Sequence, residues 1–206
     1  VNSATSALHI SCRALGLGPG DILWTVPNSF VASANVGLLC GAEVDFVDID
    51  PETYVMNISF LEKKLSEAEL KGKLPKIVMP VHFAGQSVDM KPLRELSIRY
   101  DFKVLEDASH AIGGKYLDKN IGSCTYSDIT VFSFHPVKII TTGEGGSAVT
   151  NDFSLFEKLT LLRSHGVTRS PHLMESSSPK PWQYDQIELG LNYRMTDIHA
   201  ALGISQ

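Results

Sequence analysis

A lysine stands just past a predicted strand, in the segment 130–138 (TVFSFHPVK), and a glycine-rich run at 143–146 (GEGG) follows it. If Lys138 lies partly out of water, its pKa falls and it holds a neutral amine able to form a Schiff base. A lysine considered alone is more often extended into solvent. The glycines fit either an ordinary turn or a place where a cofactor approaches the backbone closely.

A second candidate site is the segment 104–110 (VLEDASH), in which an acidic residue ends a predicted strand. Asp107 at this position could hold a protonated ring nitrogen, or it could cap a helix. His110 is a candidate active-site imidazole. A buried histidine whose hydrogen bonds are satisfied within the core is the competing interpretation.

Two further segments could bind a phosphate and a planar ring. Ala4, Thr5 and Ser6 open a helix whose free N–H groups and dipole favour an anion, although plain capping by Ser or Thr is far commoner than a phosphate site. Phe30, just past a strand end, could stack on a ring, whereas a core phenylalanine is the more frequent outcome. Ser133 is a second candidate for anion binding.

These residues need elements to position them, and the chain alternates helical and strand patterns. Strands separated by helices of this length predict βαβ units and a largely parallel sheet with helices on both faces, an α/β fold. In such sheets ligands bind beyond the carboxyl ends of the strands. The predicted helices are 4–15, 29–39, 60–70, 90–100, 152–164 and one capped by Thr196; the predicted strands are 22–26, 44–47, 76–79, 103–106, 130–133 and 147–150. Residues 170–181, rich in Ser and Pro, predict an exposed loop.

Composition excludes several classes of protein. The chain has 206 residues, 43% of them hydrophobic and 20% charged, which is ordinary for a globular domain. Its formal net charge of −5 offers no argument for binding nucleic acid or an anionic membrane. Three widely separated cysteines and the histidine spacing indicate neither a disulfide framework nor a metal site, and predict a reducing, cytoplasmic location. Because the chain starts at Val1 and ends within a predicted helix, we expect it to be part of a longer protein.

A lysine, an acid for a ring nitrogen, a stacking aromatic and two anion-binding segments together match what pyridoxal 5′-phosphate requires. At this point the sequence resembles the DegT/DnrJ/EryC1/StrS sugar aminotransferases, which are of fold type I. The resemblance covers essentially the whole chain. The blocks that carry it are NSATSALH (2–9), PNSFVASAN (27–35), VHFAGQSVDM (81–90), EDASHAIG (106–113), FSFHPVKIITTGEGG (132–146) and LGLNYRMTDIHAALG (189–203).

The resemblance implies a role for each candidate residue. It makes Lys138 the Schiff-base lysine, Asp107 the acid at the pyridine nitrogen, and Phe30 the aromatic on the cofactor ring. It places His110 near the phenolic oxygen of the cofactor. Ala4, Thr5, Ser6 and Ser133 match the phosphate cradle, and Asn192 matches an asparagine that reaches the phosphate site of a neighbouring subunit.

The same resemblance implies what the complete protein does. Residues 1–206 would be part of a pyridoxal-phosphate-binding large domain, with an N-terminal segment and a C-terminal small domain outside this chain. The reaction would move an amino group from glutamate to a nucleotide-linked 4-keto-6-deoxy sugar in a homodimer with composite active sites. Within the family, these sequence motifs are most similar to those of the aminotransferases of pseudaminic acid biosynthesis. Three alternatives stay open: an aminotransferase for another keto sugar, a dehydratase that carries histidine in place of the lysine, and a non-catalytic binding or regulatory protein.

Overall fold

The computed structural model describes residues 1–175 and 180–206, and its centre is a six-stranded sheet in the order β2-β1-β3-β4-β7-β8. Neighbouring strands run parallel except at the β7–β8 edge, which is antiparallel. The strands are β1 (Ile22–Thr25), β2 (Glu43–Phe46), β3 (Ile77–Val78), β4 (Lys103–Asp107), β7 (Ile129–Ser133) and β8 (Gly146–Val149). The α/β class predicted from the sequence is confirmed.

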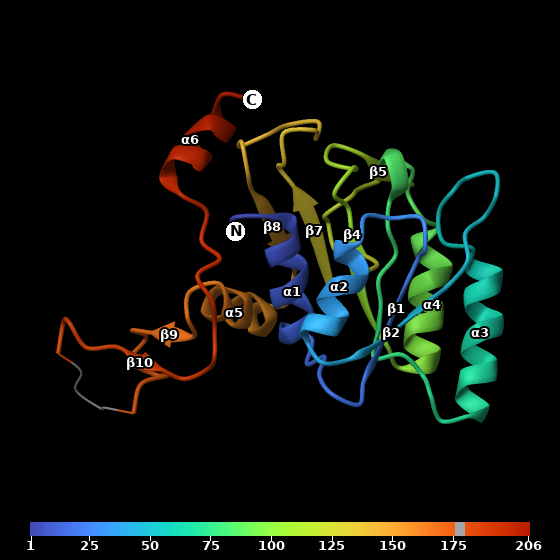
Figure 1. The fold of residues 1–206 in the computed structure, drawn as a ribbon, viewed down its shortest axis with the longest axis horizontal. Helices are drawn as coiled ribbons and strands as arrows, with labels where there is room; N and C mark the ends of the chain where they lie inside the picture. The colour runs from blue at the N-terminus through green and yellow to red at the C-terminus, as the bar shows by residue number, and fades with distance from the viewer. Residues whose placement is uncertain (176–179) are drawn as a thin grey trace.

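Helices cover both faces of this sheet and make it the middle of three layers (Figure 1). One face packs against α1 (Ala4–Ala14), α2 (Ala32–Leu39) and α5 (Phe153–Leu162), and the other packs against α3 (Ile58–Leu70) and α4 (Met90–Tyr100). The last helix, α6 (Asp197–Ile204), stands beyond the edge of the sheet, at the upper left of Figure 1.

The two cores follow from the alternation of side chains along each strand. Leu23 and Leu105 face the α1 side, whereas their neighbours Trp24 and Val104 face the α3 side, and all four are at most 2% exposed. Strands buried on both faces therefore appear in the sequence as continuous apolar runs.

Several boundaries differ from those predicted. The helix predicted from residue 29 begins at Ala32, so Phe30 precedes the helix. Asp107 is the last residue of β4 and no helix follows it, so the alternative that it caps a helix is wrong. Two short antiparallel pairs were not predicted: β5 (Lys115–Tyr116) with β6 (Lys119–Asn120), and β9 (Val167–Thr168) with β10 (Asp185–Gln186). The predicted loop 170–181 is without helix or strand where it is described, and residues 176–179 of it lie outside the described residues.

The described residues include no helix long and apolar enough to cross a membrane.

Gly146 lets the start of α1 lie directly against β8. A Cβ built at this position would lie 2.5 Å from the backbone nitrogen of Ala4 and 2.6 Å from the carbonyl carbon of Ser3. We expect Gly146→Ala to push this segment away and to lower the free energy of unfolding by about 1–3 kcal/mol, the usual cost of overpacking.

Thermal unfolding of the complete protein measures this effect, and Gly18→Ala is the matched control. Nothing lies within 4 Å of a Cβ at Gly18, so that variant should unfold within about 0.5 kcal/mol of the parent. Equal melting temperatures for the two variants would show that Gly146 is not needed for close packing.

Candidate active site

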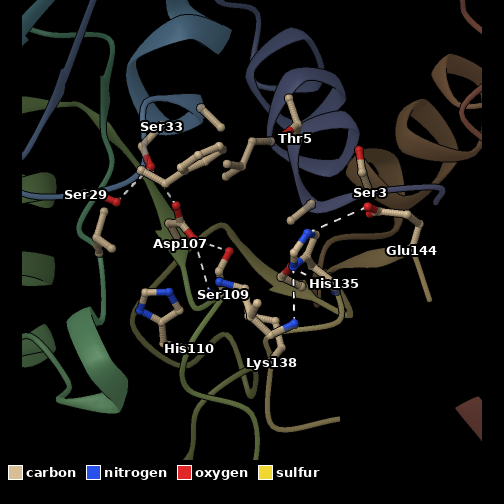
Figure 2. Close-up of a pocket in the computed structure, with 17 residues that line it drawn as sticks. Ser3, Thr5, Ser29, Ser33, Asp107, Ser109, His110, His135, Lys138 and Glu144 are labelled. Atoms are coloured by element: carbon tan, nitrogen blue, oxygen red, sulfur yellow. Dashed lines mark hydrogen bonds and ion pairs between the residues drawn. The ribbon is translucent and has the colours of Figure 1, made fainter. Parts of the chain in front are cut away.

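A cavity of about 280 Å³ opens at the carboxyl ends of β4 and β7. The amino-terminal ends of α1 and α2 border the same space, and Figure 2 shows the side chains around it. Its lining residues are Ser3, Ala4, Thr5, Leu8, Ser29, Phe30, Ala32, Ser33, Val81, Asp107, Ser109, His110, Ser133, His135, Val137, Lys138 and Glu144. The structure thus brings together seven of the residues proposed from the sequence, which lie in four separate stretches of the chain.

Asp107 is a buried carboxylate held by three hydrogen bonds. The Ser33 hydroxyl donates to Oδ2 at 2.7 Å, while the Ser109 hydroxyl and backbone N–H donate to Oδ1 at 2.6 and 3.1 Å. The residue is 4% exposed and lines the cavity. Donors on both oxygens fix the orientation of this carboxylate. Asp107 is therefore placed to hold a cationic group in the cavity.

Lys138 lies half-buried in the turn that follows β7, and its backbone N–H donates to the carbonyl oxygen of His135 at 2.9 Å. Burial lowers the pKa of the Lys138 amine, and the negative charge of Asp107 opposes that shift. At a given pH, a larger fraction of Lys138 is therefore in the neutral form needed for nucleophilic chemistry than of an ordinary surface lysine.

This lowered pKa predicts how the reactivity of Lys138 depends on pH. A free lysine is half-deprotonated at a pH of about 10.4. Because burial disfavours the ammonium form of Lys138, this residue reaches half-deprotonation at a lower pH. We expect acylation of Lys138 by a small amine-specific reagent, followed by peptide mass spectrometry, to reach half its maximal rate below that pH.

Asp107→Asn should move this midpoint further down, because it removes the opposing negative charge. Lys119, on the exposed strand β6, serves as the internal reference in the same digest. A Lys138 midpoint equal to or above that of Lys119 would contradict the prediction.

His110 lines the cavity as a partly buried imidazole. The backbone N–H of Ala84 donates to its Nδ1 at 3.2 Å, and the Phe83 ring meets it edge-on with the ring centroids 6.2 Å apart. Its pKa is lowered by burial first and by the charge of Lys138 second, against the influence of Asp107. A neutral imidazole that accepts at Nδ1 carries its proton on Nε2.

The start of α1 supplies the polar wall opposite these groups. Ser3 caps the helix by accepting the backbone N–H of Ser6 at 3.1 Å, and Ser3, Ala4 and Thr5 line the cavity. Ser6 is placed differently. It is 7% exposed, it does not line the cavity, and its hydroxyl donates to Oδ1 of Asn2 at 2.6 Å.

Three other predicted residues take distinct positions. Phe30 lines the cavity and is 74% exposed, which leaves its ring available for stacking. Ser133 lines it as the last residue of β7. Asn192 lies outside the cavity, exposed, in a bridge to Ser164 beyond α5. No described contact joins Asn192 to the site within this chain.

Six polar lining residues were not proposed from the sequence: Ser3, Ser29, Ser33, Ser109, His135 and Glu144. Ser109 could have been found, because an Asp side chain commonly accepts the backbone N–H of the residue two positions on. Ser33 had no local signal, since its partner Asp107 is 74 positions away.

An α/β domain that gathers a lysine, a buried carboxylate and a helix start around one cavity has the arrangement of a pyridoxal-phosphate enzyme of fold type I. The sequence profile of the DegT/DnrJ/EryC1/StrS aminotransferase family matches residues 1–206, and the chain belongs to that family.

Among curated relatives, the chain is 42% identical over 208 residues to the UDP-4-amino-4,6-dideoxy-N-acetyl-β-L-altrosamine transaminase of Campylobacter jejuni subsp. jejuni serotype O:23/36. It is 40% identical over 205 residues to the GDP-perosamine synthase of Caulobacter vibrioides. Both matches cover 100% of this chain and 50% of the relative. The chain therefore spans about half the length of the curated relatives it matches.

Solved structures show the same fold. PseC of Helicobacter pylori, an aminotransferase involved in the biosynthesis of pseudoaminic acid, is 36% identical with a TM-score of 0.86, covering 100% of this chain and 51% of that one. The putative sugar aminotransferase Spr1654 of Streptococcus pneumoniae, in its PLP-form, is 32% identical with a TM-score of 0.83, covering 99% and 53%. Aminotransferases of this family depend on pyridoxal phosphate.

The side chains of this cavity fit that cofactor. A carboxylate oriented by three hydrogen bonds suits a protonated ring nitrogen, and a helix start lined with hydroxyl groups suits a phosphate. Lys138, with its lowered pKa, suits the aldehyde. These side chains are thus of the kinds that the ring nitrogen, the phosphate and the aldehyde of the cofactor require.

Proposed function

We propose that the complete protein is a transaminase that moves an amino group from glutamate to a nucleotide-linked 4-keto-6-deoxy sugar. The observation that carries this proposal is the cavity that combines a lysine of lowered pKa with a buried, triply hydrogen-bonded Asp107. The particular product we propose is UDP-4-amino-4,6-dideoxy-N-acetyl-altrosamine, as in pseudaminic acid synthesis. The similarity to the Campylobacter transaminase and to PseC supports this choice.

Several residues that line the cavity have a part in this reaction. Bound pyridoxal phosphate supplies an electron sink for the charge that develops when a proton leaves the amino acid. Asp107 holds the ring nitrogen protonated, which keeps that sink strong. Lys138 would hold the cofactor through its aldehyde and, as a free amine, would accept the proton from the amino acid and return it later in the transfer. Phe30 would cover one face of the ring, His110 would present a donor N–H, and Thr5 and Ser133 would hold the phosphate.

The alternatives differ in what they require of the site. A family dehydratase has histidine in place of the lysine, whereas this chain has Lys138. A non-catalytic binding protein would not need an amine of lowered pKa near a buried carboxylate that already accepts three hydrogen bonds. The likeness to a GDP-perosamine synthase favours an aminotransferase for a different keto sugar as the second candidate.

The deciding experiment is a coupled assay of 2-oxoglutarate formation from glutamate by the complete protein. A panel of UDP-, dTDP- and GDP-linked 4-keto-6-deoxy sugars identifies the acceptor. Turnover selective for the UDP-linked N-acetyl sugar supports the proposal, and selective turnover of a GDP-linked sugar supports the second candidate. A cofactor absorbance band that no amino acid alters would refute transamination.

We further propose that the protein is a homodimer in which Asn192 of one subunit completes the phosphate site of the other. Asn192 lies exposed and outside the cavity of its own chain, so any contact with a site would have to be made across an interface. A two-fold dimer would supply two such contacts, one per active site.

Mixing inactive subunits tests this composite site. Lys138→Ala subunits are allowed to exchange with subunits made inactive at Asn192. Heterodimers should regain one intact site of the two, because one cavity then combines a wild-type Lys138 with a wild-type Asn192. Continued inactivity, with exchange verified by native mass spectrometry, would show that Asn192 does not act across the interface.

A further inference from the structure

A fully buried histidine–carboxylate pair lies directly behind the cavity. His82 is 0% exposed and its Nε2 lies 2.8 Å from Oε2 of Glu106, which is 5% exposed. Thr130 donates to the other carboxylate oxygen of Glu106 at 2.9 Å. Glu106 precedes Asp107 on β4, so the two carboxylates face opposite sides of the sheet. The proposed reaction makes no use of this pair, although buried charge is costly to retain.

The His82 ring closes the loop formed by residues 83–87. The backbone N–H of Val88 donates to Nδ1 of His82 at 3.2 Å, so Nδ1 is the acceptor. The ring proton is therefore on Nε2, which donates a hydrogen bond to Glu106. The His82 imidazole is therefore hydrogen-bonded to Val88, at the far end of the loop, and to Glu106 on β4.

This loop contacts the cavity histidine in three ways. The Ala84 N–H donates to Nδ1 of His110, the Phe83 ring lies edge-on to the imidazole, and a Cβ at Gly85 would lie 3.2 Å from the His110 carbonyl oxygen. Ala84 holds a left-handed backbone conformation, with φ of 53°, that a residue with a Cβ adopts only where its surroundings impose it. The loop is thus held in an uncommon conformation against His110.

We propose that His82 and Glu106 are positioning residues for His110. By closing the 83–87 loop, they hold the Ala84 N–H on Nδ1 of His110 and leave Nε2–H as the donor toward the cavity. His110 Nε2 has no hydrogen-bond partner among the residues that the structure describes, so it is available to a ligand. The catalytic part of this inference rests on the proposed transamination, whereas its structural part does not.

The test compares two variants of the complete protein with one control. His82→Phe/Glu106→Leu replaces both partners by apolar side chains, which avoids leaving a lone buried charge. Glu106→Gln is the conservative variant, because its amide oxygen still accepts from His82 and its amide N–H can bond to Thr130. Thr25→Val is the control: it removes a buried hydrogen bond of 3.0 Å to the Met79 carbonyl oxygen without touching the loop.

Amide hydrogen exchange of the apoprotein gives the first readout. The double variant should lose at least about tenfold protection at Ala84 and Val88, with core amides unchanged. The single variant Glu106→Gln should retain most of the protection seen in the parent protein, and Thr25→Val should leave it unaltered. If the double variant does not fold, His82→Phe/Glu106→Gln replaces it, because phenylalanine cannot accept the Val88 N–H and the glutamine leaves no buried charge.

The second readout is the pKa of His110, measured by NMR titration. Accepting a hydrogen bond at Nδ1 favours the neutral ring, so loss of the Ala84 contact should raise this pKa. The charged groups that face the ring, Lys138 and Asp107, are the same in every variant. An unchanged His110 pKa and full Ala84 protection in the folded double variant would overturn the proposal.

The third readout asks whether the pair acts through His110. In the reaction with glutamate, the double variant and His110→Gln should each slow the rate, and their combination should be no slower than the worse of the two. Residues that act through one group are non-additive in this way. Additive losses would overturn the positioning role. Absence of any glutamate-dependent signal in the parent protein would instead refute the proposed function, while the exchange and NMR results would still decide the structural part.

Discussion

Replacing Lys138 with alanine is expected to abolish turnover and to leave no cofactor that borohydride can attach covalently to the protein. Lys138 is the lysine in the cavity, and its lowered pKa makes it the amine that can bind the aldehyde. It would also move the proton in each half-reaction. Because proton transfer by a positioned side chain alone contributes about 10²–10⁴-fold, we expect a loss of at least about 10³-fold.

Lys138→Arg should fail to the same degree, because a guanidinium keeps its proton and cannot form the covalent bond. Lys119→Ala, which alters an exposed lysine of β6, should behave as the parent protein. Both results are read by mass spectrometry after borohydride treatment and by the coupled glutamate assay. Retained covalent attachment in Lys138→Ala would place the reactive lysine elsewhere.

Changing Asp107 to asparagine is expected to keep the fold and to slow the reaction by about 10²-fold or more, as when a preorganised electrostatic group is lost. The groups that bond to Asp107 can also bond to an amide side chain. Its oxygen can still receive the two donors from Ser109, and the Ser33 hydroxyl can turn to accept from the new NH₂ group. What is lost is the charge that keeps the cofactor's ring nitrogen protonated.

The rate of the half-reaction with glutamate and the absorbance of the bound cofactor measure this effect. Asp128→Asn is the matched control, because Asp128 accepts the Val104 N–H at 2.8 Å at the opposite end of β4. Its loss should affect stability and leave the rate per folded molecule nearly unchanged. Near-normal turnover in Asp107→Asn would show that another group serves the ring nitrogen.

Much of this protein was predictable from local sequence patterns. The helical period at residues 4–15 and the apolar runs at 22–26 and 103–106 predict elements that the structure contains, each with one end shifted by one residue. Such patterns are local, because a helix or strand face repeats every few residues. Lys138 and Asp107 could be selected because each follows or ends a strand, and ligand sites in parallel sheets lie at those ends.

The tertiary structure decided which of those candidates share one cavity and what holds them. Ser33 and Asp107, or Ala84 and His110, meet only because β1, β3, β4 and α2 pack side by side, and no short-range pattern encodes contacts between residues 74 or 26 positions apart. Likewise, the sequence alone could not show that Ser6 bonds to Asn2 rather than facing the cavity. The side-chain types were readable from the chain, whereas their partners, burial and lowered pKa values are properties of the packed sheet and helices.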